Sequence, residues 1–196
     1  MADQLTNEEK QILLHLAREA MENGVRGRKL SALDMKSVTP RLLENGASFV
    51  TLTINDELRG CIGALEAYQP LAEDVREHAV AAALHDPRFP RVEKSELNSI
   101  QLEVSRLSAP HLLDYFSGED LLVKLNPHVD GVILKDGHRR ATFLPQVWEK
   151  IPDPVDFLDQ LCVKMGARKN LWRDTKLQVY VYQVEEFHEK TQQAVK

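Results

Sequence analysis

Residues 47–63, ASFVTLTINDELRGCIG, contain two segments with strand character and a turn between them. Residues 47–54 are rich in β-branched side chains, which favour extended backbone. Asn55, Asp56 and Glu57 are typical of a turn, and an apolar pattern resumes at residues 58–63. This stretch therefore predicts a β-hairpin. The dipeptide Asn45-Gly46 just before it predicts a further turn.

Other parts of the chain extend the same pattern. Residues 129–134 and 138–143 flank Asp136-Gly137, a dipeptide that favours tight hairpin turns. Apolar and polar residues alternate over 100–104 and again over 177–181, as expected of half-buried strands. These segments predict a sheet built mainly from antiparallel pairs.

Helices are predicted at three places. Thr6 and Glu9 have the spacing of a capping box ahead of an apolar stripe. Pro70 suits the start of a second helix, which should end before Pro87 because a residue preceding proline avoids helical geometry. Asp153 can cap a third helix. Few helices among several hairpins predict an α+β fold, an antiparallel sheet with flanking helices.

The motif Leu-Arg-Gly-Cys-Ile-Gly at residues 58–63 carries the first candidate site. Because strand side chains alternate, Arg59, Cys61 and Gly63 should share one face. A guanidinium near a thiol favours the thiolate, and Gly60 and Gly63 would let a ligand approach. Two interpretations stay open. Cys61 is a catalytic or reactive thiol with Arg59 as its charge partner, or it is a small buried cysteine in a bulged strand.

Residues 86–90, Asp-Pro-Arg-Phe-Pro, carry the second candidate site. Two prolines stiffen this segment, which can therefore hold Arg88 in a set direction. Arg88 could anchor a carboxylate or phosphate through its planar fork, or it could simply pair with Asp86 or cap the preceding helix.

The unusual backbone demands of both motifs predict that residues 86–90 fold back beside residues 58–63. Arg59 and Arg88 would then border one pocket for a small anionic ligand. Their repulsion requires a balancing acid, Asp86 or Glu103. Glu103 and Ser105 should project to one face of their strand; if that face adjoins the cysteine strand, Glu103 could act as a base, and otherwise the face is solvated.

Other polar or sulfur-containing residues carry no comparable signal. His78 and His85 are two helical turns apart, too widely spaced for a metal site by themselves. Trp148 and Cys162 are expected in the core. The chain contains no phosphate-binding loop, nucleophile elbow or dinucleotide fingerprint, so we predict no metal and no cofactor.

The composition limits the class of protein and its cellular compartment. A net charge of -5 argues against a general nucleic-acid binder, and no apolar run is long enough to span a bilayer. The start of the chain has no signal-peptide pattern, and two distant cysteines form no disulfide framework. We therefore expect a cytoplasmic protein, 196 residues in one domain or in two tightly joined lobes without a flexible linker.

The two motifs also carry a family resemblance. Together with Leu-Pro-Gln-Val-Trp at residues 144–148 and with Cys162, Lys164 and Gly166, they resemble the AMMECR domain family, whose microbial members are called AmmeMemoRadiSam system protein A. The resemblance covers residues 5–187. It departs at Met165 and Ala167, where the family pattern has other residues.

The resemblance implies an α+β fold in which a larger lobe holds both termini and a smaller lobe is inserted. It also implies a process shared with a Memo-type protein and a radical-SAM protein, and it supplies no reaction. Two hypotheses of function follow. The protein is an enzyme or ligand-binding protein with a site centred on Cys61, or it is a non-catalytic module that docks a partner through the same surface.

Overall fold

The computed structural model describes residues 4–189. Two compact units divide the chain: the first runs to Leu107 and resumes at Glu185, and the second spans Ser108–Val184. Each unit has its own sheet and its own cluster of buried apolar side chains.

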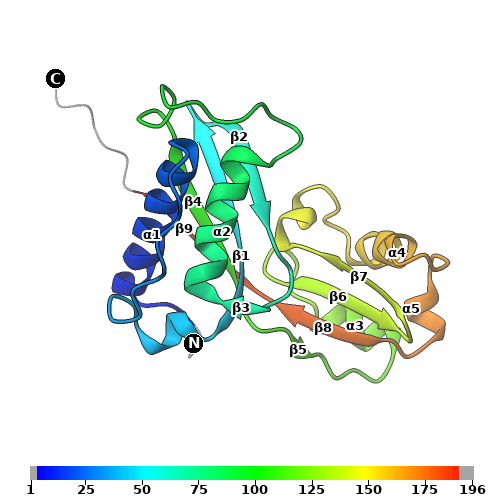
Figure 1. Ribbon diagram of the computed structural model, residues 1–196. Coiled ribbons are helices and arrows are strands. Elements are labelled where there is room, and N and C mark those ends of the chain that lie inside the picture. Colours follow the sequence, from blue (N-terminus) through cyan, green and yellow to red (C-terminus); the bar gives the residue numbers. More distant parts are fainter. Residues whose placement is uncertain (1–3, 190–196) are drawn as a thin grey trace. The chain divides into compact units, whose positions relative to one another are not determined.

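The first unit is a five-stranded sheet with two long helices (Figure 1). The strand order is β2-β1-β4-β9, β3 also pairs with β1, and β1 runs antiparallel to β2, β3 and β4. The strand β2 therefore lies at an edge of the sheet. The elements in chain order are α1 (Asn7–Val25), a 3-10 turn (Pro40–Leu43), β1 (Asn45–Ile54), β2 (Glu57–Gly63), β3 (Gln69–Pro70), α2 (Leu71–Leu84), β4 (Gln101–Leu107) and β9 (Val184–His188).

Both helices follow the sequence signals. At the start of α1, the Thr6 hydroxyl accepts from the Glu9 N–H at 3.2 Å, and the Glu9 carboxylate accepts from the Thr6 N–H at 2.8 Å, so the predicted capping box is present. Helix α2 begins after Pro70 and ends at Leu84, ahead of Pro87. The restriction on residues before proline explains where it stops.

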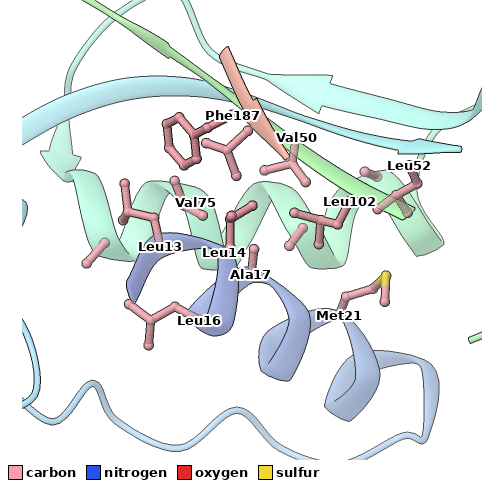
Figure 2. Packing of buried hydrophobic residues seen from close by; sticks show 14 of the residues in the cluster. Leu13, Leu14, Leu16, Ala17, Met21, Val50, Leu52, Val75, Leu102 and Phe187 are labelled. Atoms are coloured by element: carbon pink, nitrogen blue, oxygen red, sulfur yellow. The ribbon is translucent and has the colours of Figure 1, made fainter. Parts of the chain in front are cut away.

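Helices α1 and α2 pack on each other and on one face of the sheet (Figure 2). Their apolar stripes meet the strand residues that point toward them, and most of these side chains are fully buried. The contributors shown are Leu13, Leu14, Ala17 and Met21 of α1, Val75 of α2, and Val50, Leu52, Leu102 and Phe187 of the strands. This core leaves the opposite face of the sheet for other side chains.

The hairpin predicted from residues 47–63 is formed by β1 and β2. Asn55 and Asp56 have φ of 53° and 63°, the left-handed backbone that two-residue hairpin turns require. The turn predicted at Asn45-Gly46 is wrong, because both residues lie inside β1. A Cβ on Gly46 would lie 2.7 Å from the Leu71 side chain, so the glycine serves close packing there.

A β-bulge interrupts the β1–β2 ladder between Leu52 and Thr53. Leu52 pairs with Gly60, and Thr53 pairs with Leu58, so Arg59 is the extra residue on β2. The strict alternation predicted for residues 58–63 therefore breaks at Arg59.

The second unit has a four-stranded sheet in the order β5-β8-β6-β7, with antiparallel pairs throughout. The hairpin predicted at Asp136-Gly137 joins β6 and β7. The elements are β5 (His111–Leu112), α3 (Gly118–Lys124), β6 (Gly131–Asp136), β7 (Arg139–Phe143), a 3-10 turn (Pro145–Glu149), α4 (Pro154–Lys164), α5 (Leu171–Asp174) and β8 (Gln178–Tyr182). The fold class is thus α+β with antiparallel sheets, as predicted.

The core of the second unit contains the aromatic and sulfur residues that the sequence assigned to packing. Trp148 is fully buried, stacks on Phe157 with ring centroids 3.6 Å apart, and donates its indole N–H to the Asp130 carbonyl at 2.7 Å. Cys162 is also fully buried, and burial raises the pKa of its thiol. Cys162 therefore lies in the core, as the sequence predicted.

Candidate functional site

The candidate site lies on the exposed edge of β2, where the loop after α2 folds against Cys61. The Cys61 N–H donates to the Asp86 carboxylate at 2.8 Å, and the Cys61 carbonyl accepts from the Arg88 guanidinium at 3.0 Å. An edge strand normally leaves such groups unpaired. Asp86 and Arg88 satisfy them in place of a neighbouring strand. The prediction that residues 86–90 fold back beside this motif is confirmed.

Asp86 organises this loop. Its side chain is 2% exposed, and its oxygens accept from the Arg88 backbone N–H at 3.1 Å and from the Arg88 guanidinium at 2.9 and 2.6 Å. These hydrogen bonds, above all those from the guanidinium, hold the pKa of the Asp86 carboxyl well below its usual range. Asp86 therefore stays a carboxylate and holds the Arg88 guanidinium in one orientation.

Arg88 is held by Asp86 along one edge and by the Cys61 carbonyl through the second hydrogen of Nη2, so its remaining donors are the two on Nη1. Its Nε and one terminal nitrogen bind Asp86, yet the side chain remains 54% exposed. Its pKa is raised mainly by the hydrogen bond to Asp86, with a smaller contribution from the Cys61 side chain. The guanidinium also donates to the Cys61 carbonyl at 3.0 Å, which places it beside the Cys61 backbone. A preoriented arginine with donors left on Nη1 can bind an anion near Cys61.

Cys61 is partly buried, with a free thiol. It pairs with Thr51 across the β1–β2 ladder, and the Thr51 hydroxyl lies 3.3 Å from Sγ. Because the Cys61 backbone groups point to the sheet edge, this is a pair of the non-hydrogen-bonded kind, whose side chains lie closest together. Thr51 thus holds the sulfur on the face of the sheet opposite the helices.

Arg59 does not serve the thiol as the sequence suggested. Its guanidinium binds Glu96 through two nitrogens at 2.8 and 3.0 Å and donates to the carbonyls of Pro90 and Arg91 at 2.8 and 3.3 Å. The bulge at Arg59 turns the side chain to the loop. Arg59 therefore holds the loop that carries Arg88, and Arg88 is the cation that binds the Cys61 carbonyl.

The two glycines of the motif meet close neighbours and leave no vacant space. A Cβ on Gly60 would lie 2.2 Å from the Ala82 carbonyl oxygen of α2. A Cβ on Gly63 would lie 2.4 Å from the Phe49 ring, which fills the place that the sequence left open for a ligand. Both glycines thus serve close packing of the strand.

Each of the two guanidinium groups is paired with an acid. Glu96 neutralises Arg59, and Asp86 neutralises Arg88. Glu103 takes no part in this balance. It lies on β4, and β1 separates β4 from the cysteine strand, so Glu103 and Cys61 share a sheet face without being neighbours.

Two residues that contact the candidate site were not predicted from the sequence. Thr51 is the strand partner of Cys61. The predicted hairpin brings these two strands together, but the bulge shifts their register by one residue, and the sequence does not reveal the bulge. Glu96 lies 37 positions from Arg59 in a segment without regular structure, so the sequence carried no signal for it.

The histidines of α2 form no metal site. The Asp74 carboxylate binds the Ser48 hydroxyl at 2.6 Å and the His78 ring at 3.1 Å, all in the interior. His85 lines a separate surface pocket. Among residues 4–189, no group of three or more histidine, cysteine or acidic side chains has the geometry to hold a metal ion.

The chain has relatives among known proteins. The family model AMMECR1 matches residues 14–187. A protein of Thermofilum pendens is 38% identical over 202 residues, which cover 95% of this chain and 92% of that protein. A protein of Methanopyrus kandleri is 37% identical over 194 residues, 97% of this chain and 93% of its own.

A solved structure has a similar fold. The crystal structure of the uncharacterized protein PH0010 from Pyrococcus horikoshii matches with a TM-score of 0.76 and 32% identity, and the match covers 95% of this chain and 94% of that one. The chain belongs to the AMMECR1 family. Within the part of the chain that the structure describes, no helix is long and apolar enough to cross a membrane.

Proposed function

We propose that this protein binds a small anionic ligand at Cys61, and that the Cys61 thiol acts on that ligand as a nucleophile. Arg88 would hold the anion, Asp86 would orient Arg88, and Arg59 with Glu96 would position the loop. The observation that carries this proposal is the exposed guanidinium of Arg88, fixed by a buried carboxylate and hydrogen-bonded to the Cys61 carbonyl.

The chemistry of Arg88 supports an anion over a neutral ligand. Asp86 already occupies one edge of the guanidinium, but its side chain is buried, and its carboxylate accepts from Arg88 and from the Cys61 N–H. Nη2 also donates to the Cys61 carbonyl, so the donors left for a ligand are the two on Nη1. A carboxylate or phosphate can accept a charge-assisted hydrogen bond there.

A second candidate function is a protein-docking module on the same edge. The observation in its favour is a set of exposed apolar side chains on and just after β2, with Leu58 44% exposed, Leu65 36% and Tyr68 57%. Exposed apolar side chains that gather in one region are typical of interaction surfaces. In this case the Asp86–Arg88 pair would only rigidify the edge.

The family resemblance supports a proposal about the partners with which the protein performs either function. We propose that the protein acts with a Memo-type protein and a radical-SAM protein in the cytoplasm. Two free cysteines agree with a reducing compartment.

Two variants separate the candidate functions. Cys61→Ser nearly preserves shape and removes the thiol nucleophile, and Arg88→Gln removes the anion anchor. If the proposal holds, neither variant complements a deletion strain, yet both still capture the Memo-type partner in a pull-down. Arg28→Gln, an exposed arginine elsewhere in the unit, is the matched control for charge.

Full complementation by Cys61→Ser rules out nucleophilic catalysis by this thiol. Loss of the pull-down in Leu58→Ser, with complementation by Cys61→Ser retained, would instead establish the docking module. Circular dichroism of each purified variant checks that the fold is kept.

A further inference from the structure

A pocket of about 390 Å³ lies on the first unit, along a face of α2 that stays outside the buried core. Its volume falls in the range of pockets that hold small molecules, about 300–1,000 Å³. Its lining includes Glu73, Glu77, Val80 and Ala81 of α2, Leu30 of the loop after α1, and Gln69 of β3. The α2 residues recur at helical spacing, so they share one face. No lining residue belongs to the Cys61–Arg88 site, so an inference from this pocket is independent of the proposed function.

One part of the pocket is apolar and held in place. Leu30, Val80 and Ala81 are half-buried and present aliphatic surface to a ligand. The nearly buried Arg76 of α2 donates from its guanidinium to the Ser31 carbonyl, next to Leu30. The loop wall of the pocket is therefore fixed to the helix that forms the opposite wall.

The two carboxylates of the pocket have different partners. Arg76 donates to Glu73 at 2.8 Å, so the charge of Glu73 is balanced. Glu77 accepts from the neutral amide of Gln69 at 2.7 Å, and no lysine, arginine or histidine pairs with it among residues 4–189. The same amide donates to the Tyr68 hydroxyl at 3.2 Å. Gln69 thus fixes the direction of the Glu77 carboxylate without neutralising it.

Asp74 adds to the negative field at this end of the pocket. Its side chain is fully buried, and one of its carboxylate oxygens has no hydrogen-bond partner within the described part of the chain. The pKa of Tyr68 is raised by burial first, and then by the charges of Glu77 and Asp74. The field of Asp74 therefore reaches the hydroxyl that shares Gln69 with Glu77. Because buried charges are screened less than exposed ones, this end of the pocket favours a positive charge.

We propose that this pocket binds a small primary alkylamine, with its ammonium on Glu77 and its alkyl chain against Leu30, Val80 and Ala81. An ammonium group has three donors and no acceptor, which suits a carboxylate. Ala81 follows Glu77 by one helical turn, about 6 Å, which is the length of a short alkyl chain. Glu77 repels a carboxylate or phosphate, so this pocket and the Cys61–Arg88 site take ligands of opposite charge.

A titration with two matched probes tests the proposal. n-Pentylammonium carries the charge, as a lysine head group does at neutral pH, and 1-pentanol is its neutral counterpart. Binding is read from the backbone amide shifts of the nitrogen-15-labelled protein at neutral pH. The wild type should show saturable shifts at Leu30 and over residues 77–81. It should bind n-pentylammonium about fivefold more tightly than 1-pentanol, the scale of one ion pair at about 4 Å in water. Added salt should reduce this preference.

Three variants locate the charge and the apolar part. Glu77→Gln should remove the preference for the ammonium and leave 1-pentanol binding unchanged. Ala81→Leu should fill the apolar part and weaken both probes. Glu19→Gln makes the first change at an exposed position of α1 and should alter neither affinity. Circular dichroism checks that each variant keeps the fold.

The outcomes bear on this pocket alone. Equal affinity of the wild type for the two probes, or a preference for the ammonium that survives Glu77→Gln, refutes the role of Glu77. Shifts that do not saturate, or that lie outside α2 and Leu30, overturn the site. Tighter binding of Nα-acetyl-lysine methylamide than of n-pentylammonium would also overturn the small amine, because the pocket would then fit a lysine side chain of a partner protein. None of these results affects the tests at Cys61.

Discussion

Replacing Asp86 by asparagine should destabilise the first unit by about 2 kcal/mol. In the structure, both carboxylate oxygens of Asp86 accept from donors: one from the Arg88 N–H and Nε, the other from the Cys61 N–H and the second Arg88 nitrogen. An amide has one oxygen, so whichever way it turns, an N–H must face donors. A side chain that is 2% exposed cannot find water to replace the lost partner.

The size of this destabilisation follows from the hydrogen bonds that Asp86 accepts. Leaving a buried donor unsatisfied costs about 1–3 kcal/mol. The exposed side of the Arg88 pair adds little because solvent screens it. For a chain of this size, about 2 kcal/mol corresponds to a fall in Tm of roughly 4–8 °C.

The pH dependence of the stability gives a second test of the role of Asp86. The pKa of Asp86 is lowered in the folded state, so its contribution is complete above the unfolded value near pH ~4 and is lost as the pH falls toward the folded value. The difference in stability between wild type and Asp86→Asn should therefore be constant from neutral pH to about pH 5 and should shrink below that.

Urea unfolding followed by circular dichroism at several pH values measures this difference. Asp56→Asn makes the same chemical change at an exposed turn position that asparagine tolerates, and it should be nearly neutral. A cost under about 0.5 kcal/mol for Asp86→Asn, or one that persists unchanged at acid pH, would refute the role given to this carboxylate.

Two further results are expected. Gly60→Ala should lower the free energy of unfolding in urea by on the order of 1–3 kcal/mol, because the added Cβ would lie 2.2 Å from the Ala82 carbonyl oxygen. The control is Gly24→Ala on α1, which should cost far less because the nearest atoms there belong to the Val80 side chain. Equal costs for the two variants would contradict the packing argument. Cys61 should be labelled by a neutral alkylating agent in the folded protein, whereas fully buried Cys162 should be labelled only after unfolding. Peptide mapping distinguishes the two cysteines, and earlier labelling of Cys162 would contradict the assignment of the reactive thiol.

The elements that the sequence predicted best are those whose signals are local. The Asn55-Asp56 turn, the Thr6–Glu9 capping box and the end of α2 before Pro87 depend on backbone chemistry within a few residues, and the structure has them all. The short helices α3 and α5 and the two-residue strands escaped notice because their patterns are too brief to stand out.

The candidate site was predicted only in outline. The approach of residues 86–90 to the cysteine motif was expected, but the exchange of roles between Arg59 and Arg88 was not. That exchange depends on a bulge at Arg59 and on Glu96, a partner 37 positions away, and both are tertiary features. Gly63 was misjudged for the same reason, because the Phe49 ring that occupies its space lies across the hairpin.

The most direct measurement of the central claim compares two alkylating agents that differ in charge. Iodoacetate carries a carboxylate, and iodoacetamide is its neutral isostere. A guanidinium about 4 Å from the incoming carboxylate is worth about 1 kcal/mol in water, which is about fivefold in rate. The ratio of the Cys61 alkylation rates for iodoacetate and iodoacetamide should therefore be about fivefold higher in the wild type than in Arg88→Gln. It should fall with added salt and should be unchanged in Arg28→Gln. Equal ratios in the wild type and Arg88→Gln would contradict the anion site at Cys61.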